Sequence, residues 1–182
     1  MPKRARNTSE PSYPALSPLA RAIGKRQPFD SPAVEAFLSV MRTASWLGAP
    51  VERLLKGHDL SAATYNLLRI LRGAAAAGLE HGRACHEIGE HMVAQVPDVT
   101  RLVDRLEKAG LVERTRCELD RRVVYVRITR AGLELLATID APLLALHATQ
   151  LGHMKPSEIS QLCELLERAR ASNATRSSAT TT

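Results

Sequence analysis

The strongest constraint on the fold is a change in the spacing of apolar residues between Val99 and Ile128. Apolar side chains first recur at the helical intervals i, i+3, i+4 and i+7, at Val99, Leu102, Val103 and Leu106. Gly110 then stands where helices commonly end. Beyond it the spacing becomes two, which places three side chains on one side of a strand: Val124, Val126 and Ile128. With Leu111–Arg116 as a first strand and the CELD stretch as a loop, the pattern predicts a helix followed by a β-hairpin.

Helix start signals divide the rest of the chain. Side chains able to cap a helix, or prolines suited to its first turn, occur at Ser31, Ser61, Pro97, Thr129 and Pro156. A short helix is expected over Arg83–Met92, although its HGRACHEIGEH sequence has no clear polar cap, which predicts a weakly formed helix. Because an interior proline costs about 3 kcal/mol, Pro50 and Pro142 are expected to kink or end their helices.

Composition favours a mainly helical fold with a small β-hairpin wing, an α+β class. Hydrophobic residues make up 45% of the 182 residues but aromatic residues only 3%, so the core must be aliphatic. Three cysteines cannot form a complete set of disulfides within the chain, which fits a reducing cytoplasm. No stretch reaches the roughly 20 apolar residues of a membrane span, so we expect a cytoplasmic protein without a membrane partner.

Positive charge is concentrated in one region. The formal net charge is +6, and residues 101–130 contain nine Lys or Arg against five Asp or Glu. Three helices followed by a hairpin with arginines at its tip predict a winged helix-turn-helix, whose second helix enters the major groove of DNA. The sequence therefore predicts double-stranded DNA as a partner.

Two sets of residues are candidates for DNA contact. On the outward side of the helix over 97–109 these are Pro97, Thr100, Arg101 and Arg105. On the hairpin they are Arg114, Arg116, Arg121 and Arg122, with Asp120 holding a neighbouring arginine in place. The helix face alone is equally typical of an ordinary solvated surface. The hairpin favours DNA, because clustered arginines repel one another unless phosphates neutralise them.

The run VTRLVDRLEKAGLVERTRCELDRRVVYVRITRAG, Val99–Gly132, resembles the signature of the MarR family of bacterial winged helix-turn-helix regulators. A weaker resemblance over Thr43–Leu71 extends it to about residues 32–170. The resemblance implies an obligate homodimer, joined by the first helix and the last two, that binds a near-palindromic operator with half-sites about 10 bp apart. In the family's D-x-R motif the last arginine probes the minor groove; here it is Arg122, with Arg121 contacting phosphate.

The resulting division of the chain has five parts. We expect a flexible basic, proline-rich arm (1–30), an N-terminal dimerisation helix (31–58), the winged helix-turn-helix (59–129), C-terminal dimerisation helices (130–171) and a disordered tail (172–182).

Regulation and alternative functions remain open in the sequence. The resemblance implies a cleft for an aromatic or phenolic acid, which Trp46, Tyr65 and Arg69 could line, although core packing is the commoner role for such residues. Cys117 in the charged wing offers redox regulation as an alternative. A winged helix used only for protein contacts is a further alternative, but it has no need of clustered wing arginines.

Enzymatic and metal-binding functions are not supported by any motif. No nucleotide loop, catalytic triad or paired acids appear, so we expect no catalytic residue and no cofactor. The HEIGEH sequence resembles H-E-x-x-H, but His86 and His91 are five residues apart. That spacing puts them about 140° apart on a helix, so no metal site is expected.

Overall fold

The computed structural model describes residues 16–117 and 123–177. The chain divides into two compact units, Met1–Gly48 and Ala49–Thr182, and the boundary falls within helix α2 (Pro32–Lys56). Residues 1–15 of the predicted arm and residues 178–182 of the predicted tail lie outside the described residues.

The first unit contains a short helix, α1 (Pro18–Ala22), and residues 32–48 of α2. The hydroxyl of Ser17 caps α1 by accepting from the Ala20 amide, so residues 18–22 of the predicted arm are helical. Ala20 and Phe29 are buried. As predicted, Ser31 precedes α2, and its hydroxyl accepts from the Val34 amide at 3.3 Å.

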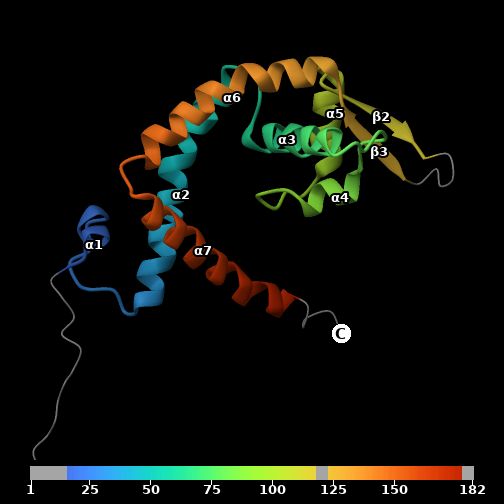
Figure 1. Ribbon diagram of the computed structural model, residues 1–182. Coiled ribbons are helices and arrows are strands. Elements are labelled where there is room, and N and C mark those ends of the chain that lie inside the picture. Colours follow the sequence, from blue (N-terminus) through green and yellow to red (C-terminus); the bar gives the residue numbers. More distant parts are fainter. Residues whose placement is uncertain (1–15, 118–122, 178–182) are drawn as a thin grey trace, which may run out of the picture. The chain divides into compact units, whose positions relative to one another are not determined.

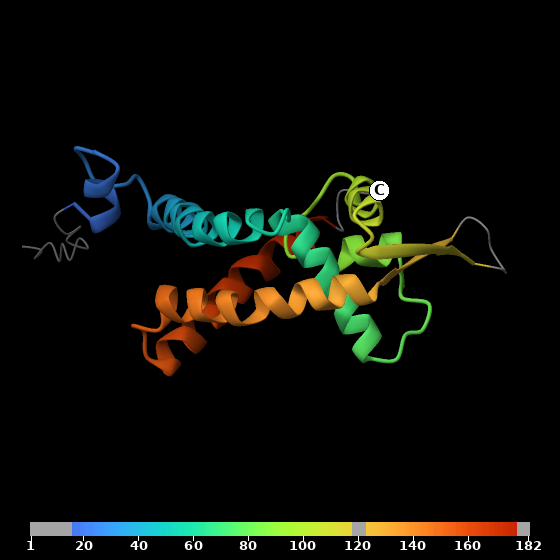
Figure 2. The ribbon, with the colours of Figure 1, turned by 90° about the horizontal axis from the view of Figure 1, so that it is seen from above.

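The second unit combines helices with a small sheet (Figures 1 and 2). In chain order it contains α3 (Ala62–Ala76), β1 (Arg83–Ala84), α4 (Cys85–Glu90), α5 (Val99–Lys108), β2 (Val112–Arg116), β3 (Val124–Ile128), α6 (Arg130–Leu151) and α7 (Pro156–Ser177). The part from α3 to β3, residues 62–128, is called the winged lobe below. In both views β2 and β3 project beyond α3, α4 and α5.

The sheet is antiparallel with the order β1-β3-β2. The predicted hairpin is confirmed, with Val112 opposite Ile128 and Arg116 opposite Val124. The sequence did not predict β1, because a two-residue strand has no detectable period. Gly82 allows it to approach β3: its φ is +78°, and a Cβ there would lie 2.0 Å from the Val126 carbonyl oxygen.

A single aliphatic core holds the winged lobe to its neighbouring helices, as the composition predicts. Its fully buried members come from α2, α3, α4, α5, β3 and α6: Leu55, Leu67, Leu68, Leu71, Ile88, Val103, Leu106, Val126, Leu136 and Ile139. The mainly helical, winged fold expected from the sequence is thus confirmed.

Neither proline ends its helix, since α2 continues through Pro50 and α6 through Pro142, so that part of the two proline predictions is wrong. A proline removes the hydrogen bond to the carbonyl four residues earlier. Those carbonyls belong to Trp46 and Thr138, both exposed residues that water can reach. Both helices therefore continue past a missing hydrogen bond, stabilised by the packing of their other residues.

Among the described residues, α6 is long and apolar enough to cross a membrane by length and composition, with a mean hydropathy of 1.3 in its most apolar window. The core helix of a soluble fold passes the same test. Of that window 22% is buried, including Leu136, Ile139 and Leu143 in the core of the second unit, and one such helix is weak evidence for a membrane.

Candidate nucleic-acid interface

Helix α5 begins two residues later than predicted, at Val99 rather than Pro97. Asp98 is the N-cap, and its Oδ1 accepts from the Arg101 amide at 3.1 Å. Proline has no side-chain acceptor to satisfy a free amide, so it stands in the preceding loop while the aspartate starts the helix.

The two sides of α5 differ sharply. Val103 and Leu106 are buried, whereas the residues predicted to face outward are exposed: Pro97, Thr100, Arg101 and Arg105. The Arg101 side chain is 87% exposed, and its Nε lies 3.0 Å from Asp98 Oδ2. Such an exposed ion pair contributes at most about 1 kcal/mol. The guanidinium of Arg101 is therefore free to turn toward a ligand.

Helix α4 supports α5 and is better capped than its sequence suggests. Ala84 at the N-cap has no polar side chain, but Glu87 compensates, because its Oε2 accepts from the Ala84 amide at 3.1 Å. The helix is shorter than the predicted Arg83–Met92, since its first two residues pair with β3 as a strand.

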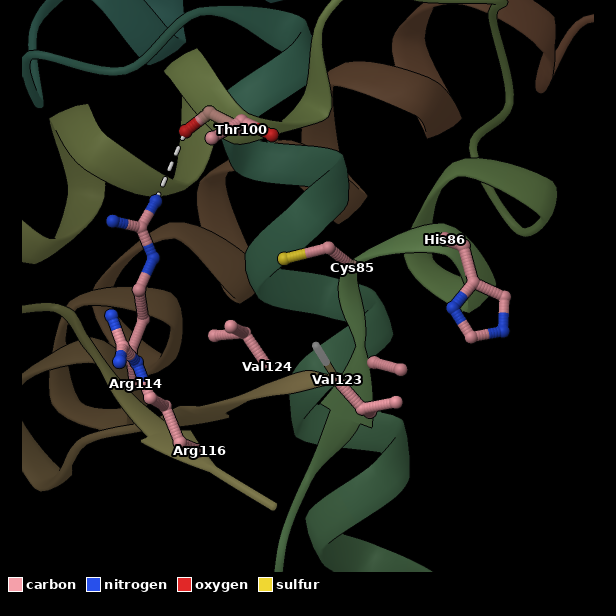
Figure 3. Close-up of a pocket in the computed structure, with 8 residues that line it drawn as sticks. Cys85, His86, Thr100, Arg114, Arg116, Val123 and Val124 are labelled. Carbon is pink, nitrogen blue, oxygen red and sulfur yellow. Dashed lines mark hydrogen bonds between the residues drawn. The ribbon is translucent and has the colours of Figure 1, made fainter. Parts of the chain in front are cut away.

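Arg114 of β2 turns back toward α5 and forms three hydrogen bonds with it. Its guanidinium donates to Asp104 at 2.5 Å, to Glu107 at 3.1 Å and to the Thr100 carbonyl at 3.1 Å. Figure 3 shows the last of these three bonds. The side chain is only 25% exposed. The wing is thereby fastened to α5, and two carboxylates neutralise an arginine that the sequence grouped with the candidate DNA contacts.

The two other described arginines of the wing strands differ in their surroundings. Arg116 is exposed at the end of β2, whereas Arg127 of β3 is paired with Glu113 at 2.5 Å. Asp120, Arg121 and Arg122, the predicted tip of the wing, lie outside the described residues.

A cavity of about 620 Å³ separates the start of α5 from the wing. Figure 3 shows its lining, to which α4 contributes Cys85 and His86, α5 contributes Thr100, and the wing contributes Arg114, Arg116, Val123 and Val124. Burial raises the pKa of the Cys85 thiol above its ordinary value. Cys85 therefore remains a neutral thiol rather than a reactive thiolate.

A second cavity, of about 510 Å³, lies between α3 and α6 and is called the α3–α6 cavity below. Its lining is Tyr65, Asn66, Arg69, Asp140, Leu143, Leu144 and His147. Arg69 donates to the Tyr65 hydroxyl at 3.1 Å and lies 3.7 Å from Asp140. Two of the three residues predicted to bind an effector, Tyr65 and Arg69, thus lie together. Trp46 belongs to the first unit, is 71% exposed and lies under the Arg42 guanidinium.

An ion pair that the sequence did not predict involves Asp140, one of the residues that line the α3–α6 cavity. Arg72 donates two hydrogen bonds to Asp140, at 2.6 and 3.0 Å. These bonds hold the pKa of Asp140 below its ordinary value. The two residues are 68 positions apart in the chain, and neither lies in a recognisable motif, so only the folded arrangement brings them together.

The remaining candidate residues form no further site. The described part of the chain contains no group of three His, Cys, Asp or Glu side chains that could hold a metal ion. Cys85, Cys117 and Cys163 form no disulfide. The Cys117 amide donates to the Val123 carbonyl at 3.0 Å, where the hairpin strands part. Its redox role stays a prediction.

Comparisons with known proteins agree with this architecture. The model of the MarR family matches residues 60–124. The chain is 41% identical to a MarR transcription factor from Planctomyces limnophilus whose crystal structure covers 76% of this chain, with 98% of that structure matched and a TM-score of 0.58. It also resembles in fold a mutant MarR from E. coli complexed with operator DNA, at 21% identity, with coverages of 75% and 94% and a TM-score of 0.66.

Part of the chain is also similar to a protein that is named a repressor. The HTH-type transcriptional repressor IacR from Pseudomonas putida is 28% identical over 117 residues, which are 64% of this chain and 66% of that protein. The chain thus spans just under two thirds of this relative's length.

Proposed function

The chain belongs to the MarR family of transcription regulators, and on that premise we propose that it represses transcription by binding a near-palindromic DNA operator as a homodimer. The observation that supports the proposal is the attachment of the wing to α5 through Arg114, because it holds in one fixed arrangement the two elements that we propose to contact DNA. A module used only for protein contacts would have no need of this arrangement.

In this proposal α5 lies in the major groove. Thr100 and Arg101 reach base edges, while Arg105 and the loop at Pro97 contact the flanking backbone. Arginine suits this position because its planar guanidinium can donate to both acceptors of a guanine edge. The exposed, weakly paired Arg101 side chain has this freedom.

The wing follows the adjacent minor groove. Arg116 and Arg121 contact phosphates, and Arg122, held by Asp120, enters the groove. Arg114 has a different role from the one the sequence suggested. Because Asp104 and Glu107 already neutralise it, it sets the distance between wing and helix instead of contacting phosphate.

Dimerisation rests on apolar side chains that the single chain leaves exposed. They occur on three of the long helices, as Phe37, Val40 and Met41 of α2, Leu144 of α6, and Leu162 and Leu165 of α7. Apolar patches of this kind are typical of protein interfaces. A second copy of the chain would cover them and bring two α5 helices to two half-sites.

Repression is proposed because IacR, the curated relative, is named a repressor. A small aromatic or phenolic acid would bind in the α3–α6 cavity, with its carboxylate on Arg69 and its ring near Tyr65, and its binding would cause the protein to release the DNA. Neither a cofactor nor a catalytic step is needed. With genomic DNA as the proposed partner, we place the protein in the cytoplasm.

The test begins with selection of bound sequences from a random pool of duplex DNA, which should yield a near-palindrome.

On that operator, Arg116→Gln should weaken binding and lower the slope of log K against log salt by about one. Arg101→Gln should change base preference at one position of each half-site by about 1–3 kcal/mol. Arg170→Gln, which removes an exposed arginine of α7, is the matched control and should change neither. If the protein shows no binding to duplex DNA in dilute buffer, the proposal is refuted.

A further inference from the structure

The turn between α4 and α5 is tied to α3 by one side chain, Asn66. Its Oδ1 accepts from the Val93 amide at 2.8 Å, across 27 positions of sequence. Among the described residues, no other hydrogen bond joins residues 93–97 to the rest of the winged lobe. Val93 is 90% exposed, so its own side chain does not anchor this part of the turn, although Met92 just before it packs against the core.

The position of this turn decides where α5 begins. It ends at Asp98, the residue that caps α5 and whose carboxylate accepts from the Arg101 amide. A displacement of the turn would therefore move the first residues of α5, among them Thr100 and Arg101. Asn66 thus acts on DNA contact from a distance, as a positioning residue.

Asn66 also belongs to the wall of the α3–α6 cavity, next to Tyr65 and Arg69. Its amide oxygen is committed to Val93, whereas its amide nitrogen has no hydrogen-bond acceptor among the described residues. The primary amide supplies two donors there. A carboxylate bound at Arg69 would therefore find two donors on the same side chain that holds the turn, and hydrogen bonds to it can reorient that side chain.

We infer that Asn66 couples the α3–α6 cavity to the recognition helix: a carboxylate held by Arg69 accepts from the Asn66 amide and draws it away from Val93, which releases the turn before α5. This inference rests on the proposed function, and it adds the residue through which an effector acts. The coupling is reciprocal, so operator DNA, which needs the turn in place, must weaken the binding of the acid by the same factor.

The positioning role is tested without any effector. Asn66→Ala removes the acceptor and should raise amide hydrogen exchange in residues 91–98, while exchange in the core of α3 stays as in the wild type. Operator affinity should fall by roughly fivefold to tenfold, the scale of one lost hydrogen bond. The salt slope should not change, because no phosphate contact is removed. Unchanged exchange in residues 91–98 would overturn the inference.

Asn66→Asp is the conservative variant. It keeps an oxygen at the same place, so protection of the Val93 amide and operator affinity should return to within about twofold of the wild type. It also places a second carboxylate beside Asp140 in the cavity, which should repel an acid. If Asn66→Asp exchanges as fast in residues 91–98 as Asn66→Ala does, the hydrogen bond to Val93 is not what holds the turn.

The sensing role is tested with 4-hydroxybenzoate as the probe. It should lower wild-type operator affinity and accelerate exchange in residues 91–98, and both responses should be lost in Asn66→Ala. An equal response in Asn66→Ala overturns the coupling, and so does a wild type that does not respond. Failure of the wild type to bind any duplex DNA is a different result, because it refutes the proposed function itself.

Discussion

The winged lobe and helix α7 are both rich in aliphatic residues, but they use them differently. The lobe closes around its own core, in which Leu67, Leu68 and Leu106 are at most 1% exposed. Along α7, from Pro156 to Ala171, no described side chain is buried, and Leu165 is 51% exposed. Burial of apolar area is the main force that stabilises helices in proteins. The lobe therefore buries its apolar side chains within one chain, and α7 does not.

The difference teaches how an apolar stripe should be interpreted. A stripe at helical spacing shows that one side of a helix will be covered, but not which chain covers it. In the lobe, α3 and α5 lie within 50 residues of each other in sequence and cover each other's stripes. For α7 we propose that a second copy of the chain provides the cover.

The largest expected effect tests this proposal directly. Leu162→Glu combined with Leu165→Glu would place charges in the proposed dimer interface, where their desolvation is unfavourable. We expect a monomer in sedimentation velocity, a lobe that stays folded, and operator affinity reduced by about a thousandfold, because a monomer loses the gain from binding two half-sites together.

The control for this pair adds the same charge away from the two leucines on the same helix, as Ser157→Glu with Ser160→Glu. Both residues are exposed, and Ser160 lies on the opposite side of the helix from Leu162 and Leu165, so the dimer and its affinity should remain. If the leucine variant stays dimeric, another surface must hold the two chains together.

A smaller effect is expected when the lobe core is opened. Leu68→Ala should lower the free energy of unfolding by about 3 kcal/mol, because it leaves a cavity in a packed interior. The loss should be the same at every protein concentration, as measured by urea unfolding. Leu165→Ala, in contrast, should cost more as the protein is diluted, because its stabilisation depends on dimer formation. A Leu68→Ala loss that varied with concentration would mean that the lobe also needs its partner to fold.

Much of the lobe could be predicted from sequence because its signals are local. The change from helical to alternating spacing between Leu106 and Val124 correctly gives α5 and the hairpin, and Ser61 and Thr129 act as the predicted caps. The continuation of the helices through the prolines could not be predicted, because it does not depend on local sequence alone. Whether Pro50 ends a helix depends on the surroundings of the carbonyl that it leaves without a partner, and a local pattern does not contain that information.

The candidate site was predictable in composition but not in arrangement. Sequence identifies Arg114 and Arg116 as equivalent wing arginines. Only the folded chain shows that one is held by Asp104 and Glu107 while the other is exposed. The role of Asn66 could not be predicted, because single polar residues are common on helices and only the folded chain brings Asn66 to the Val93 amide.

The smallest expected effect concerns the ion pair that joins α3 of the lobe to α6. Arg72 and Asp140 have side-chain exposures of 28% and 42%, so solvent screening limits their contribution to about 1 kcal/mol. Asp140→Asn should lower the free energy of unfolding by about that amount at pH 7. Glu134→Gln, which breaks the more exposed pair with Arg130, is the control and should cost about 0.5 kcal/mol or less.

The pH dependence of this pair has a defined sign. Because Arg72 lowers the pKa of Asp140 in the folded chain, the folded state binds this proton less readily than the unfolded state. The contribution is therefore complete above the ordinary aspartate pKa of about 3.9 and is lost as the pH falls through the lower, folded value. The gap in unfolding free energy between wild type and Asp140→Asn should narrow from pH 7 to pH 3 in urea titrations. A gap of the same size at both pH values would show that Asp140 stabilises the contact between lobe and α6 by packing and not by charge.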